Sequence, residues 1–251
     1  MLDNNILKHI NKLQQKKYRK EYEEFLIEGV KGVEEILRSD FNVSSVVIEG
    51  DRRESFKDII DLCDRKGVDI EYCGRKDIDK IKDTETFPGV MAIADQEDYS
   101  LDDVLGSSII CLDGVKDPGN LGTIIRTADW FGISSLVLSE DCVDVYNPKV
   151  VRSSMGSLFR VKIFQSNDLS NTINNLKDKH KYAIVGLCME GDLIKKIDGA
   201  KKTVYVFGSE SHGIREEVEK ILNKKYTIAG KGQAESLNVA ISVGIVLNNI
   251  S

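Results

Sequence analysis

The stretch that decides the fold lies near the end of the chain and reads Gly230-Lys231-Gly232-Gln233-Ala234-Glu235-Ser236-Leu237-Asn238-Val239-Ala240. It joins a glycine-rich loop to an apolar run that predicts a helix over residues 237–249. Glycines permit positive φ and a close approach of the backbone to a ligand. Ser236 is expected to cap the helix, whose free amides could meet a polar ligand. A capped helix that packs on a sheet would account for the same residues.

Strands and helices alternate throughout the half of the chain that contains this stretch. The expected strands are 109–112, 136–138, 161–164, 183–187, 204–207 and 226–228, and the expected helices are 121–131, 148–155, 169–179, 215–222 and 237–249. Nearly continuous apolar strands separated by helices predict an α/β domain with a parallel sheet covered on both faces. Such sheets bind ligands at the carboxyl ends of their strands. Three glycine-rich loops leave such ends, at residues 113–122, 208–213 and 229–238.

The first half of the chain predicts a smaller α/β domain. Its strands are expected at 25–27, 43–48, 68–72 and 90–94, with helices at 30–38, at 56–63 and near residues 78–81. The acidic segment 95–106 marks the junction, so the predicted domains are residues 1–97 and 105–251. Residues 1–20 are expected to form one amphipathic helix with a basic end, which is either a solvated face or a contact for RNA phosphates.

Composition limits the possible partners. The 251 residues carry a net charge of −6, which does not favour general binding to polyanions, so any RNA surface must be a local patch. The start of the chain does not resemble a signal peptide, and no apolar run approaches a membrane span, so a cytoplasmic protein without a membrane partner is expected. Five widely spaced cysteines and three scattered histidines predict neither a disulfide framework nor a metal site.

The glycine loops do not fit the common nucleotide sites. Residues 114–119 have the glycine spacing of a phosphate loop, but Asn120 and Leu121 stand where lysine and a hydroxyl are needed. Gly230 and Gly232 lack the third glycine of a dinucleotide fingerprint and come at the wrong end of the fold. The string 209–212, Ser-Glu-Ser-His, lacks a nucleophile-elbow pattern.

Each loop belongs to a longer motif. The three stretches read Asp113-Gly114-Val115-x-Asp117-Pro118-Gly119-Asn120-Leu121-Gly122-x-Ile124-x-Arg126-Thr127-Ala128, Val206-Phe207-Gly208-Ser209-Glu210-Ser211-His212-Gly213-Ile214, and Ile228-x-Gly230-x-Gly232-x-x-x-Ser236-Leu237-Asn238-Val239-Ala240. In this order they resemble motifs 1, 2 and 3 of the SpoU/TrmH branch of the SPOUT RNA methyltransferases. Lys149-Val150-Val151-Arg152-Ser153-Ser154-Met155-Gly156 is similar to the stretch between motifs 1 and 2, and Phe25-Leu26-Ile27-Glu28-Gly29 resembles an L30e-like substrate-binding domain.

The resemblance implies a fold and a cofactor that composition does not show. It implies a SPOUT domain whose parallel sheet ends in a C-terminal trefoil knot, preceded by a small α/β L30e-like domain. S-adenosylmethionine would lie bent in the knot, and two copies would form a homodimer with the active site near their interface. The family commonly has Ile-Pro-Met before the last glycine loop, where this chain has Ile228-Ala229-Gly230.

The resemblance also implies roles for individual residues. The methyl donor would be held by Leu187, Gly208, Ser209, Ile228, Gly230, Ser236 and Leu237. The catalytic residues would be Asn120, Arg126, Glu210, Ser236 and Asn238. Arg126 and Ser154 would also face the RNA. Independently of the resemblance, the basic end of the first helix predicts RNA contacts at Lys16, Lys17, Arg19 and Lys20. Since an arginine is a poor base, Arg126 is expected to hold a phosphate or to favour ionisation of the ribose hydroxyl, and a surface salt bridge is the other explanation of this residue. Glu210 is expected to accept a hydrogen bond or to pair with Arg126.

These residues predict transfer of a methyl group from S-adenosylmethionine to a ribose 2′-hydroxyl, with no metal, and ribosomal RNA, 23S in particular, as the substrate. A tRNA substrate, a non-catalytic RNA-binding or ribosome-assembly factor, and an enzyme that confers antibiotic resistance by the same chemistry are the alternatives. The sequence does not identify the nucleotide, or decide between naked RNA and a ribosomal particle.

Overall fold

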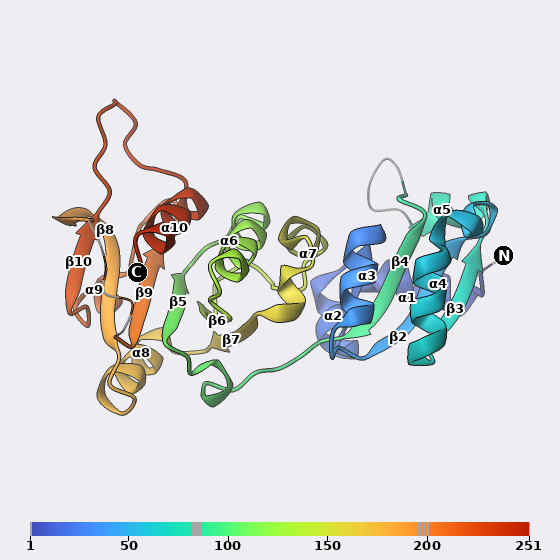
Figure 1. The fold of residues 1–251 in the computed structure, drawn as a ribbon, viewed down its shortest axis with the longest axis horizontal. Helices are drawn as coiled ribbons and strands as arrows, with labels where there is room; N and C mark the ends of the chain where they lie inside the picture. The colour runs from blue at the N-terminus through green and yellow to red at the C-terminus, as the bar shows by residue number, and fades with distance from the viewer. Residues whose placement is uncertain (1, 82–86, 195–196, 198, 200, 251) are drawn as a thin grey trace. The chain divides into compact units, whose positions relative to one another are not determined.

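The chain forms two units of structure. The computed structural model describes residues 2–81, 87–194, 197, 199 and 201–250 (Figure 1). Internal contacts group residues 1–97 with 144–159 as unit 1, and residues 98–143 with 160–251 as unit 2. The sequence-based division placed 144–159 in the second domain, whereas its contacts are with the first unit.

Unit 1 is built on a four-stranded mixed sheet. The strand order is β1 (Glu24–Glu28), β4 (Val90–Asp95), β2 (Val43–Glu49) and β3 (Asp69–Cys73). Strand β4 runs antiparallel to β1 and β2, and β2 runs parallel to β3. The helices are α1 (Asn4–Leu13), α2 (Lys16–Tyr22), α3 (Val30–Arg38), α4 (Lys57–Lys66), α5 (Arg75–Ile81) and α7 (Pro148–Ser154), with a 3₁₀ turn η1 at Gly50–Phe56.

The N-terminal helix expected over residues 1–20 is two helices. Leu7, Ile10 and Leu13 of α1 recur at helical spacing and are buried in the core of unit 1. The chain then takes an extended conformation at Gln15, with φ −99° and ψ 132°, before α2 begins. This break corrects the prediction of one helix. The apolar positions of α1 end at Leu13, and the Gln14 side chain donates a hydrogen bond to the Ile81 carbonyl at 3.0 Å.

Unit 2 contains the parallel sheet that the sequence predicts. Six strands run in the order β10 (Lys224–Thr227), β8 (Ala183–Leu193), β9 (Thr203–Gly208), β5 (Ser108–Asp113), β6 (Ser135–Ser139) and β7 (Lys162–Ser166), and every neighbouring pair is parallel. The helices are α6 (Pro118–Trp130), α8 (Leu169–Asp178), α9 (Glu216–Glu219) and α10 (Val239–Asn248). The expected α/β class is therefore confirmed.

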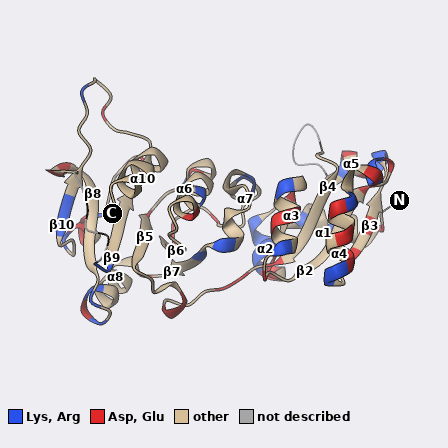
Figure 2. Ribbon diagram, viewed as in Figure 1, with Lys and Arg blue, Asp and Glu red and all other residues tan. Residues whose placement is uncertain are grey.

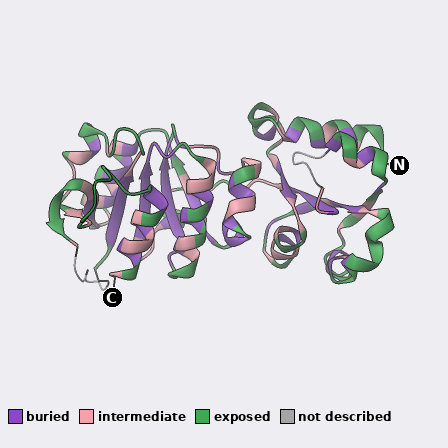
Figure 3. Cartoon of the chain, turned by 90° about the horizontal axis from the view of Figure 1, so that it is seen from above, coloured by how far each residue is buried: buried purple, intermediate pink, exposed green. Residues whose placement is uncertain are grey.

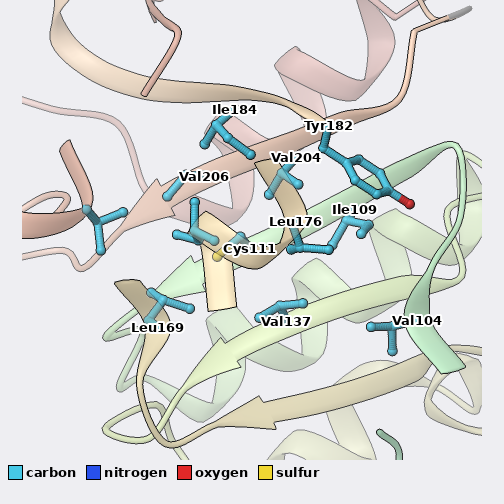
Figure 4. Packing of buried hydrophobic residues seen from close by; sticks show 12 residues of the cluster. Val104, Ile109, Cys111, Val137, Leu169, Leu176, Tyr182, Ile184, Val204 and Val206 are labelled. Atoms are coloured by element: carbon cyan, nitrogen blue, oxygen red, sulfur yellow. The ribbon is translucent and has the colours of Figure 1, made fainter. Parts of the chain in front are cut away.

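The central strands of unit 2, β9, β5 and β6, are almost fully buried between helices (Figure 3), whereas the edge strand β10 is exposed or half-buried. One side of the sheet carries an apolar cluster in which Cys111, Val137, Ile184 and Val206 from four strands meet Leu176 of α8 (Figure 4). Burial raises the pKa of the Cys111 thiol well above its usual value, so this cysteine acts as a small core residue. This packing fixes the strand ends on which the glycine loops are mounted.

Two kinds of feature are absent from the described part of the chain. No helix there combines the length and apolar character that a membrane span requires. No group of three or more His, Cys, Asp or Glu side chains there comes together as a metal site would need.

Candidate active site

Three of the strands in unit 2 bring the motifs to one edge of the sheet. In the register of β5 and β9, Asp113 lies opposite Gly208, and in that of β8 and β9, Leu187 lies opposite Phe207. Because these strands are parallel, the loops that leave their carboxyl ends start side by side. Motifs 1 and 2 and the predicted donor residue Leu187 therefore share this edge.

A local cap positions Asn120 of motif 1. Asp117 precedes α6 and accepts a hydrogen bond from the Asn120 amide nitrogen at 2.8 Å, and Pro118 occupies the first helical turn. An aspartate cap followed by proline is a strong helix start, because the carboxylate satisfies a free amide and proline needs no donor there. The cap fixes the half-buried Asn120 at the start of α6, in the loop that leaves the carboxyl end of β5.

A chain of side-chain hydrogen bonds joins the three motifs. Asn120 of motif 1 donates from Nδ2 to Glu210 Oε1 of motif 2 at 2.6 Å. Asn238 of motif 3 donates from its Nδ2 to Asn120 Oδ1 at 2.9 Å. Residues that are 90 and 118 positions apart are thus in direct contact. Glu210 was expected either to accept a hydrogen bond or to pair with Arg126, and in the structure it accepts a hydrogen bond from Asn120.

The turn of motif 2 depends on glycine. Ser209 and Gly213 exchange two backbone hydrogen bonds of 3.0 Å, which close the loop that carries Glu210. A β-carbon on Gly208 would lie 1.9 Å from the Gly213 carbonyl carbon, so no other residue fits without moving the loop. Gly213 itself has φ +67°. The turn is therefore held in one conformation with Glu210 at its exposed tip.

Asn238 also starts helix α10. Its Oδ1 accepts hydrogen bonds from the amides of Ala240, at 2.9 Å, and Ile241, at 3.4 Å. The helix cap expected at Ser236 is therefore at Asn238, and the helix begins two residues later than predicted. One side chain thus caps α10 through its oxygen and contacts Asn120 through its nitrogen, as only an amide side chain can do.

Arg126 lies exposed on α6, two turns after the cap. Within the described part of the chain no hydrogen bond or ion pair engages its guanidinium, and the surface salt bridge that was the alternative explanation of this arginine has no partner there. A permanently charged group without a protein partner is available to a phosphate or a developing oxyanion.

The loop from residue 228 to 238 has the properties that a methyl donor needs. Residues 229–238 are exposed, and no backbone hydrogen bond to a described residue occupies the amides or carbonyls of residues 229–237. A β-carbon on Gly230 or Gly232 would meet no atom within 4 Å. Half-buried Ile228 and exposed Leu237 flank the loop with apolar surface. Free backbone groups beside apolar side chains suit an adenosine ligand.

Two models of known protein families match the chain. A model of the SpoU rRNA Methylase family matches residues 107–248, more than half of the chain, and a model of the MRM3-like substrate binding domain matches residues 4–92. The chain belongs to the SpoU rRNA Methylase family.

Relatives of this family member match it over nearly its whole length. The 23S rRNA (guanosine(2553)-2′-O)-methyltransferase RlmP of Bacillus subtilis is 29% identical over 98% of this chain and 96% of its own. A TrmH-family protein from Porphyromonas gingivalis is 30% identical, with a TM-score of 0.86 over 99% of this chain and 98% of that one. An AdoMet-bound rRNA methyltransferase from Sinorhizobium meliloti is 30% identical. Its TM-score is 0.83, and the match covers 98% of this chain and 94% of that one. The expected family and SPOUT-type fold are confirmed.

Two residues of this SpoU methylase for which the sequence analysis predicted no role connect motif 1 to the segment that follows motif 2. Asp113, which is 1% exposed, accepts hydrogen bonds from Arg215 N at 2.8 Å and Arg215 Nε at 2.6 Å. Burial alone would lower the pKa of Arg215, but the charge and hydrogen bonds of Asp113, with the nearby Asp141, outweigh it and raise that pKa. An aspartate at the end of an apolar strand was the signal that could have revealed this anchor.

Two predicted RNA contacts need correction. Arg19 is only 2% exposed and donates to Asp144 Oδ2 at 2.5 and 3.0 Å, so its guanidinium is not on the surface. Ser154 is fully buried, and its hydroxyl donates to the Val151 carbonyl at 2.8 Å. Both side chains therefore make their hydrogen bonds within unit 1. Lys16, Lys17 and Lys20, in contrast, are exposed on α2 (Figure 2).

Proposed function

We propose that this protein transfers a methyl group from S-adenosylmethionine to a ribose 2′-hydroxyl of 23S ribosomal RNA. The observation that carries the proposal is the hydrogen-bonded chain Glu210–Asn120–Asn238, which unites three loops at the carboxyl edge of a parallel sheet. Asn238 ends the open glycine loop, and helix α6, which has Asn120 in its first turn, carries an exposed arginine with no partner among the described residues. A site of this build can position two substrates without needing an acid or a base of unusual pKa.

The donor would be held by residues of motifs 2 and 3. Gly208, Ser209, Ile228, Gly230 and Leu237 would supply backbone groups and apolar walls, and Leu187 and Ser236 would border the same pocket. When bound, S-adenosylmethionine supplies a methyl group on a sulfonium, which already is a good leaving group. The structural support is the free backbone of the 229–237 loop, and the AdoMet-bound relative from Sinorhizobium meliloti has the same fold.

The protein's part in the reaction is positioning and charge stabilisation. Arg126 would hold the RNA phosphate and stabilise the negative charge that develops on the 2′-oxygen as its proton leaves. Asn120, Glu210 and Asn238 would keep the loops in register and orient the ribose, and the Ser236 hydroxyl would border the reacting atoms. Alignment of two bound reactants can account for a large share of such a rate enhancement.

Ribosomal RNA is the substrate that the findings favour. The relative from Bacillus subtilis is named for a 2′-O-methylation of 23S rRNA, and the match to a substrate-binding domain over residues 4–92 supports our proposal that this part of the chain binds the RNA. Only RNA offers a ribose 2′-hydroxyl as acceptor. We therefore assign residues 1–97 to RNA binding and 105–251 to methyl transfer, in the cytoplasm where ribosomes are made.

We further propose that the active form is a homodimer with a trefoil knot at the carboxyl end of each chain. A groove of about 490 Å³ between α6 and α10 is lined by Thr127, Phe131, Ile241 and Ile245. Ile241 is 54% exposed, and nearby Trp130 is 84% exposed. Large apolar side chains gathered on one exposed face suit pairing with the same face of a second copy.

A methyl-transfer assay tests the proposal. The purified protein would be given S-adenosylmethionine with a tritiated methyl group and, in parallel, unmodified 23S rRNA, 16S rRNA or tRNA. Label recovered in a 2′-O-methylnucleoside from 23S rRNA is the expected result. Label in tRNA would replace 23S rRNA by tRNA as the assigned substrate. Label on a base would show that the methyl group does not go to the ribose 2′-hydroxyl. Donor binding without transfer to any RNA or ribosomal particle would favour the non-catalytic alternative.

A further inference from the structure

A line of polar and aromatic side chains crosses the surface of unit 1, whereas the predicted catalytic residues belong to unit 2. It consists of Lys12, Tyr18, Tyr22, His9, Glu24 and Ser44, and we call it the Tyr22 strip. Lys12 Nζ donates to Tyr22 Oη at 2.7 Å, and the rings of Tyr18 and Tyr22 stack with centroids 6.3 Å apart. Two helices and two strands contribute to it, so it is a feature of the folded unit rather than of one segment.

The strip continues from Tyr22 into a set of hydrogen-bonding groups. The His9 ring meets the Tyr22 ring edge-on, with centroids 4.9 Å apart, and its Nε2 lies 2.6 Å from Glu24 Oε2. The Ser44 hydroxyl donates to Glu24 Oε1 at 3.3 Å and to the Ile93 carbonyl at 3.1 Å. A carboxylate has about four lone-pair sites, so Glu24 retains capacity for a further donor.

The strip ends in a cavity of about 410 Å³. His9, Glu24 and Ser44 line it together with Asn5 and with the apolar side chains of Ile6 and Ile93. Apolar walls with a few converging polar groups are the usual build of a small-ligand site. The exposed lysines of α2, Lys16, Lys17 and Lys20, follow Lys12 closely in the chain and belong to the same unit.

We propose that the Tyr22 strip binds one unpaired guanine nucleotide of the RNA substrate, with the base in the cavity and the phosphate at Lys12. The reasoning rests on the proposed function for the presence of RNA. Unstacked bases in single-stranded RNA bind to aromatic side chains and are read on their Watson–Crick edges. Guanine carries two adjacent donors on that edge, N1–H and N2–H₂, which match the carboxylate of Glu24, whereas adenine presents only one donor there.

Binding of labelled oligonucleotides to the full-length protein tests this assignment. The probes would be oligouridines that carry a single central guanosine or adenosine, or none, and affinity would be read by fluorescence anisotropy. Wild-type protein is expected to prefer the guanosine probe about tenfold. Glu24→Gln should abolish that preference. Tyr22→Ala should lower the affinity for all probes about tenfold, whereas Tyr22→Phe should keep the wild-type affinity because the ring can still stack.

Controls separate recognition from folding and from the proposed reaction. Glu54→Gln changes an exposed carboxylate on η1, outside the strip, and should leave the preference intact. Ser44→Ala gives a second, milder variant of the cavity if Glu24→Gln unfolds unit 1, and it should reduce the preference. Two results would overturn the assignment of the Tyr22 strip as a guanine site. One is equal affinity of the wild type for all probes, and the other is a guanosine preference that survives in both Glu24→Gln and Ser44→Ala. Methyl transfer by the wild type to 23S rRNA, measured in parallel, would in that case still support the proposed function.

Discussion

At the scale of single residues, Asn120 holds the candidate site together. Its amide donates to Glu210 and accepts from Asn238, so it needs both a donor and an acceptor in one short side chain. Aspartate has the same shape but only acceptors when it is ionised. The site is therefore sensitive to a change that leaves its volume almost unaltered.

Asn120→Asp should lower the rate of methyl transfer at least about tenfold. The new carboxylate would face Glu210 across the 2.6 Å contact and push the turn of motif 2 away. Initial rates with labelled donor measure the effect. Asn174→Asp, an exposed change on α8, is the matched control and should retain full activity. Equal rates for Asn120→Asp and the control would mean that the hydrogen-bonded chain has no role in the reaction.

Asp113→Asn should destabilise unit 2 by about 1–3 kcal/mol. The carboxylate is buried and accepts two hydrogen bonds from Arg215, and the amide would turn a donor toward one of them. This loss is smaller than the about 3–5 kcal/mol that breaking a fully buried ion pair costs, because the Arg215 side chain is 43% exposed. Urea unfolding measures the loss. Asp141 is 48% exposed and lies 3.9 Å from Arg215, so Asp141→Asn should cost less stability than Asp113→Asn. A larger loss in Asp141→Asn would contradict the role of Asp113 as the anchor of Arg215.

At the scale of elements, local pattern was enough to find the strands of the large sheet, but it missed the break between α1 and α2 and the contacts between elements. Buried strands and amphipathic helices have periods that the sequence displays, so all six strands of unit 2 were found. The contact of Asn120 with Glu210 and that of Arg19 with Asp144 join residues 90 and 125 positions apart. No local period encodes such pairs, which is why Arg19 was predicted on the surface among its lysine neighbours.

Helix α2 supplies the next prediction, because its three exposed lysines can meet RNA phosphates. Replacing Lys16, Lys17 and Lys20 with glutamine should weaken RNA binding and reduce the slope of log affinity against log salt by about 0.7–0.9 for each phosphate that the lysines neutralise in the wild type. Titrations at several salt concentrations measure the slope, and donor affinity should not change. An unchanged slope would assign α2 to a merely solvated face.

At the scale of the whole molecule, the apolar face of α6 and α10 predicts a two-fold dimer. Ile241→Asp would place a charge in the groove between these helices, where it would be desolvated on pairing. Light scattering is expected to find a dimer for the wild type and a monomer for this variant. Met189→Asp, a charge at an exposed position on β8 outside the groove, should leave the dimer intact. A wild type that is a fully active monomer would exclude this interface.

In the proposed methyltransferase site, three loops at one sheet edge act together with Arg126 of α6. Single-turnover methyl transfer by Arg126→Ala, at saturating S-adenosylmethionine and 23S rRNA, tests this assignment most directly. The rate should fall about 100-fold while donor affinity, measured by calorimetry, is retained, and Arg126→Lys should recover part of the rate because the charge is kept. Transfer at the wild-type rate by Arg126→Ala would contradict this assignment.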